Sequence, residues 1–297
     1  LWYAGVDPNQ LCFKHAGCFD VGVKCGGWGK IIVEAKVQIS LSNRISRWQG
    51  FMVTCYLVDD ILIDTGFVKV GQLLAQFTKN HEVNAICCTH NHEDHSGNCA
   101  RIARQHACPV YLRGHDKLWD EGVEPMAIYR RIWWGRPQPY QPVEMPEVID
   151  GRNRTLQAIP IPGHSQTQVA FYDAANGLVF VGDLFVSGGV TAVMSHENPY
   201  QSVQSLRHIA ALKPHKMFNG HGLIVERPAE KLLDKASKIE AAAGRVVAWH
   251  REGMGERRIL DRLFDNGSRR DWLMDKMTSG EFSRKNFIRA CINHSPG

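Results

Sequence analysis

Four side chains that commonly bind metal ions lie within six residues of this sequence. His90, His92, Asp94 and His95 directly follow the apolar run 84–89, which is typical of a buried strand. Loops at the carboxyl ends of strands often carry the chemistry of α/β proteins. Imidazole and carboxylate ligands suit zinc, iron or manganese without any thiolate. Because alternate residues of an extended loop point the same way, the two leading histidines can bind one ion, and the following turn directs the other two side chains to a second. The alternative is a polar loop that is rich in histidine by chance.

Three further residues extend this pattern along the chain. His164, Asp183 and His221 each follow a short apolar, strand-like run, and each is directly preceded by glycine. Glycine lets the backbone turn sharply, so that a short side chain can reach inward. A single histidine beside glycine is more often an ordinary loop residue. Three such positions downstream of a dense histidine cluster favour a shared metal site.

The elements that position these residues are visible as a strand and helix pattern between residues 51 and about 225. The dipeptides Asp59-Asp60 and Asn176-Gly177 each separate two apolar runs, as hairpin turns do. The strands are predicted at residues 31–40, 51–58, 60–63 and 156–161, and the helices at residues 68–77, 97–106 and 199–212. Residues 129–142 contain three prolines, so we expect neither a helix nor a central strand there. That segment is interpreted as a loop over the site, with a surface loop or a homodimer contact as alternatives.

The order of these motifs resembles the metallo-β-lactamase-fold superfamily of hydrolases, and more specifically its lactonase and glyoxalase II-like branch. The matching motifs are 89–97 (THNHEDHSG), then His164, Asp183 and His221, preceded by 62–66 (LIDTG). The resemblance covers about residues 50–225. It implies an α/β fold, the αββα sandwich, in which two mixed sheets face each other and helices lie outside. The ligands would gather at one edge of the sandwich.

The family pattern also implies a role for each residue of the site. It implies two ligand sets, His90, His92 and His164 for the first metal ion, and Asp94, His95 and His221 for the second. Asp183 would bridge both ions. Asp64 would be an outer residue that supports the histidine-rich loop, although the residues alone also allow a turn-forming aspartate there.

The activity implied by the resemblance is that of a dinuclear metal-dependent hydrolase. Two divalent ions, zinc in the first instance and iron or manganese as alternatives, would share a hydroxide that attacks an ester, a lactone or a thioester of a small-molecule substrate. Asp94 is the candidate for moving the proton. Asp183 stands where β-lactamases proper have cysteine or serine, which argues against that activity. A phosphodiesterase or nuclease on the same fold is the first alternative, and a non-catalytic metal-binding protein is the second.

The composition changes after about residue 226. We expect residues 1–225 to form the catalytic domain and residues 226–297 a helical C-terminal extension, with helices at 228–252, 257–264, 270–278 and 283–292. Basic side chains recur in the extension, at Arg251, Arg257, Arg258, Arg269 and Arg270. They are interpreted as a solvated helix face rather than as a nucleic-acid contact.

The overall composition is that of a globular protein, with 22% charged and 44% hydrophobic residues and a net charge of +5. No apolar stretch is long enough to cross a bilayer. The first residue is leucine, so a removed targeting peptide is an open alternative. The nine cysteines form no disulfide framework and favour a cytoplasmic location. Cys12, Cys18 and Cys25 raise the alternative of a separate metal site, although their spacing fits no common zinc motif.

Overall fold

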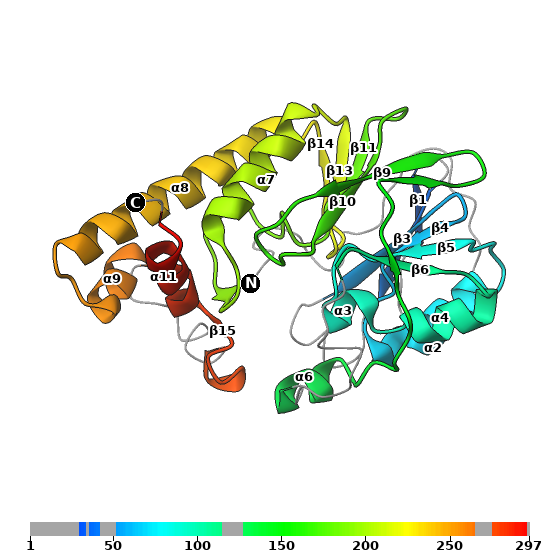
Figure 1. Cartoon of the computed structure of the whole chain (residues 1–297), viewed down its shortest axis with the longest axis horizontal. Helices are drawn as coiled ribbons and strands as arrows, with labels where there is room; N and C mark the ends of the chain where they lie inside the picture. The colour runs from blue at the N-terminus through cyan, green and yellow to red at the C-terminus, as the bar shows by residue number, and fades with distance from the viewer. Residues whose placement is uncertain (1–29, 34–35, 42–51, 115–126, 265–274, 296–297) are drawn as a thin grey trace.

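Two β-sheets face each other and helices cover their outer sides (Figure 1). The computed structural model describes residues 30–33, 36–41, 52–114, 127–264 and 275–295. The predicted αββα sandwich is therefore confirmed. Three features of the sequence lie outside the described residues: Cys12, Cys18 and Cys25, which raised the alternative of a separate metal site, Arg269 with Arg270, and most of the predicted helix at 270–278.

The first sheet is mixed, with antiparallel pairs from β1 to β4 and parallel pairs from β4 to β7. Its order in the described residues is β1 (Lys30–Val33), β2 (Lys36–Leu41), β3 (Val53–Val58), β4 (Ile61–Ile63), β5 (Ala85–Cys87), β6 (Val110–Leu112) and β7 (Val143–Glu144). The hairpin predicted at Asp59-Asp60 is confirmed. The single strand predicted over 31–40 is wrong, because β1 and β2 form a hairpin in which Val33 pairs with Lys36. Both strands alternate with the same period, so the pattern contains no sign of the reversal.

The second sheet is also mixed. Its order in the described residues is β14 (Ile224–Glu226), β13 (Lys216–Phe218), β11 (Leu178–Phe180), β10 (Val169–Asp173), β9 (Thr155–Pro160) and β8 (Val148–Asp150). Only the β11 and β13 pair is parallel. The predicted hairpin at Asn176-Gly177 joins β10 and β11, and Gly177 has the positive φ of 64° that this turn requires. A separate pair of short strands, β12 (Val193–Met194) and β15 (Phe282–Ser283), joins the loop after β11 to the C-terminal part of the chain.

The helices lie outside the sheets, and none of those in the described part of the chain has the length and apolar character of a membrane span. They are η1 (Val68–Val70), α2 (Gly71–Thr78), α3 (Glu93–Ser96), α4 (Cys99–His106), α6 (Ile128–Trp133), α7 (Pro199–Ala211), α8 (Ala229–Arg251), α9 (Glu256–Leu263) and α11 (Arg284–Asn293). The helices predicted at 199–212, 228–252, 257–264 and 283–292 are confirmed to within two residues. The prediction that residues 129–142 contain no helix is wrong for α6. Its three prolines all lie beyond the end of α6, and Gly135, with φ at 85°, follows that end.

Strand β3 shows why the central strands are buried on both faces. Tyr56 and Val58 point between the sheets, where they meet Phe180 and Phe218 of the second sheet. Leu57 points outward and joins the cluster that α2 and α4 cover. Because successive side chains of a strand alternate between faces, a strand with two covered faces reads as a continuous apolar run.

Helices α7 and α8 together cover the outer face of the second sheet. Leu206 of α7 and Leu232 and Ala236 of α8 belong to one buried cluster with Val179 and Met217 of the sheet. Figure 1 shows the two helices lying side by side along that sheet. Helix α8 therefore belongs to the core that supports the site, and the division at residue 225 stays a prediction.

Candidate metal centre

All seven predicted ligands lie in loops or short turns that follow strands of the two sheets. The motif His90–His95 follows β5 and includes the single-turn helix α3, while His164, Asp183 and His221 follow β9, β11 and β13. Backbone hydrogen bonds join the sheets at this edge, from Val169 N to Thr89 O at 2.8 Å and from Thr54 N to Gly220 O at 2.8 Å. The loops of both sheets are thereby held against each other.

The first predicted ligand set converges through three ring nitrogens. His92 Nδ1 lies 3.0 Å from His90 Nε2 and 3.1 Å from His164 Nε2. The potential ligand atoms of these three residues all lie within 4.8 Å of one another. That spacing suits three ligands around one ion.

The second predicted set lies beside the first. The ligand atoms of Asp94, His95 and His221 also lie within 4.8 Å of one another. Asp183 lies next to both sets, since its Oδ1 is 3.3 Å from His95 Nε2 and 3.1 Å from His221 Nε2, and its Oδ2 is 3.7 Å from His164 Nε2. The structure thus brings all seven predicted ligands together, with the aspartate between the two sets.

Each of four histidines has a partner on the ring nitrogen that points away from the cluster. The pairs are His90 Nδ1 with Thr89 Oγ1 at 3.0 Å, His95 Nδ1 with Asp64 Oδ2 at 2.9 Å, His221 Nδ1 with Met52 O at 2.8 Å, and His164 Nδ1 with Glu197 Oε2 at 3.3 Å. A proton held by such an acceptor leaves a lone pair on the opposite nitrogen Nε2. The ring orientations therefore favour ligation at the cluster.

Asp64 lies at the end of β4 beneath the histidine-rich loop. Its carboxylate accepts hydrogen bonds from Thr89 N at 2.7 Å and from Thr89 Oγ1 at 2.9 Å, in addition to its contact with His95. Asp64 is 2% exposed and has a φ of 58°. The side chain thus supports the two loop positions on either side of His92, which is more than a turn-forming aspartate would do.

The electrostatics of the cluster divide the histidines into two kinds. Burial, followed by repulsion from the neighbouring histidines, lowers the pKa of His90 and His92 well below its usual range. Burial also acts to lower the pKa of His95, but Asp183, Asp94 and Asp64 outweigh it and raise that pKa. A metal ion at His95 would therefore displace a proton.

Two buried atoms at the centre lack suitable partners. His95 Nε2 and Asp183 Oδ1 are buried, and neither makes a hydrogen bond of acceptable geometry with the described residues. Buried polar atoms are normally paired. A cation between them would satisfy both, and an imidazole nitrogen with a carboxylate oxygen is a suitable donor set for zinc or iron. The residues present therefore fit divalent metal ions.

Glycine precedes three of the ligands for two different reasons. Gly163 and Gly182 have positive φ values of 139° and 49°, as the predicted sharp turns require. Gly220 has no positive φ. A Cβ on Gly220 would overlap the His95 ring and come within 2.8 Å of Asp183 Oδ1, so close packing requires glycine there.

Several charged side chains around the cluster carry no sequence signal. Glu93 is buried and pairs with Arg130 of α6 at 3.0 Å, and Arg130 also approaches Glu281 at 3.4 Å. Burial raises the pKa of Glu93 to about 7. Lys235 of α8 donates a hydrogen bond to Leu184 O at 3.1 Å, directly after the central aspartate. The two residues of each pair lie between 37 and 151 positions apart in the chain, so no local motif reveals them.

Comparisons with known proteins agree with this geometry. Residues 48–221 match the family model described as the metallo-beta-lactamase superfamily. The chain is 28% identical to the atrochrysone carboxyl ACP thioesterase of Aspergillus fumigatus, over 63% of this chain and 55% of that protein. It is 22% identical to a hydroxyacylglutathione hydrolase of Aeromonas salmonicida, over 72% of this chain and 77% of that protein. A crystal structure of TTHA1623 in a di-iron-bound form is similar with a TM-score of 0.50 and 31% identity, over 61% of this chain and 92% of that one.

Proposed function

Because this chain belongs to the metallo-β-lactamase superfamily, we propose that it is a hydrolase and that it cleaves an acyl thioester, with carboxylic esters and lactones as related substrates, at a centre of two divalent metal ions. The observation that carries the proposal is the convergence of two ligand sets on either side of Asp183. The di-iron form of a protein 31% identical to this chain supports the number of ions. Zinc and iron both suit the ligands, and manganese is the third choice.

The residues of the site divide the work between holding the metal ions and moving a proton. When bound, two divalent ions would lower the pKa of a shared water molecule and polarise the substrate carbonyl group. His90, His92 and His164 would hold one ion and Asp94, His95 and His221 the other, with Asp183 between them. Asp94 is partly exposed, with 13% of its side chain accessible, so it can exchange a proton with the substrate and with solvent.

The choice of an acyl substrate rests on the relatives. One relative is named a thioesterase and another a hydroxyacylglutathione hydrolase, and both names describe the hydrolysis of an acyl compound. The alternative phosphodiesterase activity has less support. Neither of these relatives is named for a phosphodiester substrate.

The experiment combines metal analysis with a substrate panel. We expect about two metal ions per chain, and hydrolysis of an acyl thioester at least tenfold faster than hydrolysis of a β-lactam or of a bis-phosphodiester. Asp183→Asn should lose both the second ion and the activity, since an amide is a poorer bridging ligand than a carboxylate. Glu240→Gln, which removes a surface carboxylate paired with Arg207, serves as the control. A chain that binds no zinc, iron or manganese would refute the proposal.

A further inference from the structure

Glu197 contacts the predicted ligand His164 but belongs to none of the predicted motifs. We infer that Glu197 is a positioning residue that orients His164 for metal binding, and that the C-terminal segment, residues 275–295, holds Glu197 in place. The inference rests on the proposed metal centre. It adds a structural role for the part of the chain that follows the family match.

The two carboxylate oxygens of Glu197 have different partners. Oε2 lies 3.3 Å from His164 Nδ1, and Oε1 accepts a hydrogen bond from Met194 N at 2.8 Å. The side chain is 12% exposed, so solvent competes little for these contacts. A carboxylate on the outer nitrogen of a ligating histidine fixes the tautomer and the orientation of the ring. Glu197 would thus keep the proton on Nδ1 and the lone pair on the nitrogen that faces His90 and His92.

The backbone holds Glu197 opposite His164. Glu197 N donates to Met194 O at 3.2 Å, which closes a short turn, and Asn198 N donates to Gly163 O at 2.8 Å. The second bond joins the residue after Glu197 to the residue before His164. The loop and the ligand therefore form one small hydrogen-bonded unit.

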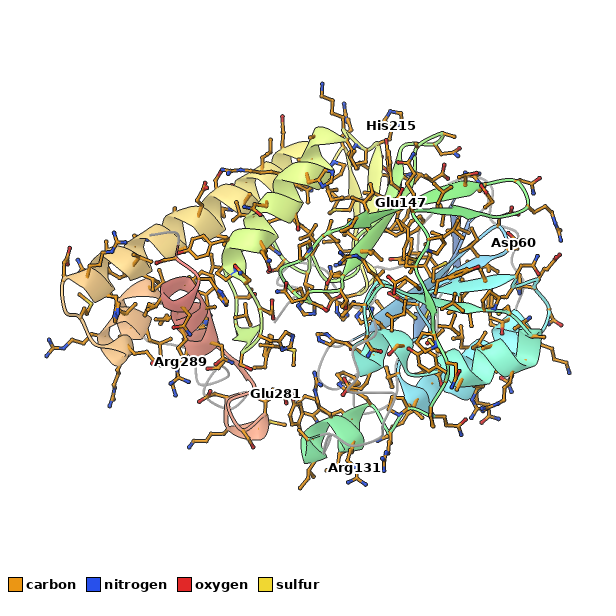
Figure 2. All side chains as sticks on the ribbon, in the orientation of Figure 1. Asp60, Arg131, Glu147, His215, Glu281 and Arg289 are labelled. Atoms are coloured by element: carbon orange, nitrogen blue, oxygen red, sulfur yellow. The ribbon has the colours of Figure 1, made fainter. Side chains whose placement is uncertain are left out.

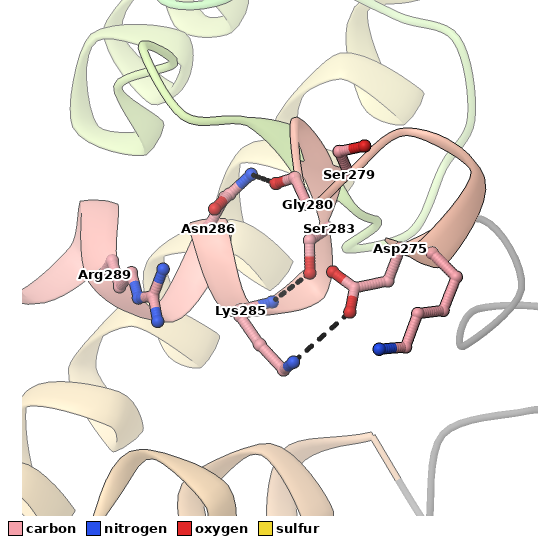
Figure 3. A pocket seen from close by; sticks show the side chains of 8 residues that line it. Asp275, Ser279, Gly280, Ser283, Lys285, Asn286 and Arg289 are labelled. Atoms are coloured by element: carbon pink, nitrogen blue, oxygen red, sulfur yellow. Dashed lines mark hydrogen bonds and ion pairs between the residues drawn. The ribbon is translucent and has the colours of Figure 1, made fainter. Parts of the chain in front are cut away.

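The C-terminal segment continues this unit through a two-stranded sheet. Val193 and Met194 of β12 pair with Ser283 and Phe282 of β15. Asn286 of α11 is buried, and its Nδ2 donates to Val193 O at 3.2 Å. Figure 3 shows Asn286 directed toward the turn at Gly280, whose carbonyl oxygen accepts a further bond at 3.0 Å. A continuous path of contacts thus leads from α11 through β12 to Glu197 and His164.

The test measures zinc affinity rather than activity alone. Zinc binding is titrated against a competing chelator in the full chain, for the wild type, Glu197→Gln and Glu197→Ala. We expect Glu197→Ala to weaken one of the two sites by about 10- to 100-fold. The glutamine amide has a single acceptor oxygen and can satisfy only one of the two partners, so Glu197→Gln should fall between the other two proteins. The absorption spectrum of the cobalt-substituted protein should change for Glu197→Ala, because the orientation of His164 affects the ligand field.

Two variants, one in α11 and one at its N-cap, test the role of the C-terminal segment. Asn286→Ala removes the bond to Val193 O together with those to Gly280 O and Glu281 O. Ser283→Ala leaves the bond to Val193 O in place and removes the N-cap, in which the hydroxyl oxygen accepts from Lys285 N at 3.2 Å, and the hydrogen bond with the Asp275 carboxyl group. Asn286→Ala should weaken the same zinc site several-fold, and Ser283→Ala should leave it unchanged. Equal zinc affinities for the two variants would overturn the role of the segment.

The outcomes separate this inference from the proposed function. Two zinc ions in the wild type with unchanged affinity in both Glu197 variants would overturn the inference and leave the proposed function standing. A wild-type chain that binds no zinc, iron or manganese would overturn both. Glu197→Gln preserves the shape of the side chain, so the test remains decisive if Glu197→Ala does not fold.

Discussion

The substitution Asp64→Asn changes one buried group beneath the proposed metal centre and almost nothing of its shape. The asparagine oxygen can still accept from Thr89 N, but the amide nitrogen then faces His95 Nδ1, which currently donates to Asp64 at 2.9 Å. Asparagine tolerates the positive φ of this position, so no backbone strain is added. Two donors cannot pair, so His95 must either lose its partner or move its proton to Nε2, the atom that the metal ion needs.

The magnitude follows from the bond that is lost. A hydrogen bond to a charged group contributes about 1.5–3 kcal/mol, so the free energy of unfolding of the metal-free protein should fall by about that amount. At about 2–4 °C for each kcal/mol, the melting temperature should fall by roughly 3–12 °C. The affinity for the second metal ion should fall by about 10- to 100-fold, as for other outer partners of ligating histidines.

The assay compares Asp64→Asn with a matched control in the same sheet. Asp60 is also buried, and its carboxylate accepts from Asn84 Nδ2 at 2.8 Å and from Arg152 N at 3.0 Å. It lies at the opposite end of β4, at the edge of the molecule in Figure 2, far from Glu281. Asp60→Asn should lower the melting temperature without changing the metal content. If Asp64→Asn retains two metal ions at wild-type affinity, the reasoning about the His95 tautomer is wrong.

Three further predictions concern packing, pH dependence and an ion pair. Gly220→Ala should lose one metal ion, because the added Cβ overlaps the ligands. Gly244→Ala, whose Cβ meets no atom within 4 Å, should bind two ions, and its free energy of unfolding in chemical denaturation should rise by about 0.5–1 kcal/mol. Equal metal contents in the two variants would contradict this prediction. Burial lowers the pKa of Lys235 to about 8 from a usual value of 10.5, so the folded protein favours the neutral amine. The charged amine therefore lowers the free energy of unfolding by its full amount below pH 8, and this loss disappears as the pH rises from 8 to 10.5. Lys235→Met should therefore be more stable than the wild type in urea denaturation at pH 7, by up to about 3 kcal/mol, and this advantage should shrink toward pH 10.5, whereas a constant difference would rule the explanation out. Arg154→Met should lower the free energy of unfolding by about 3 kcal/mol and leave the metal content unchanged, because Asp173, which is 1% exposed, loses its guanidinium partner at 2.9 Å. A decrease of less than about 1 kcal/mol would count against a buried ion pair.

The sequence predicted most of what local patterns can encode. The apolar runs before His90, His164 and Asp183 indicated strands, and the turn at Asn176-Gly177 indicated its hairpin. These signals lie within a few residues, where spacing and side-chain type decide the conformation. The family resemblance added the sandwich and the grouping of the ligands, because the order of the motifs is specific to that fold.

The features that the sequence did not predict depend on contacts between distant residues. Glu197 lies 33 positions from His164, and Arg130 lies 151 positions from Glu281, so neither pair forms a pattern in the chain. Helix α6 forms despite the prolines that follow it, because proline restricts chiefly its own position and the residue before it. The placement of α8 in the core also follows from tertiary packing, since an amphipathic helix has the same periodicity wherever it docks.

The position of α8 over the second sheet has a consequence for protein synthesis. Every candidate ligand, up to His221, leaves the ribosome before α8, whose buried residues begin at Leu232. During that interval the outer face of the sheet, including Val179 and Met217, is covered by α7 alone. Exposed apolar surface of this kind promotes aggregation and chaperone binding in nascent chains. We therefore expect all seven ligands to be synthesised before the nascent protein can hold them in a stable arrangement. Metal ions should bind only after α8 has left the ribosome and packed on the sheet.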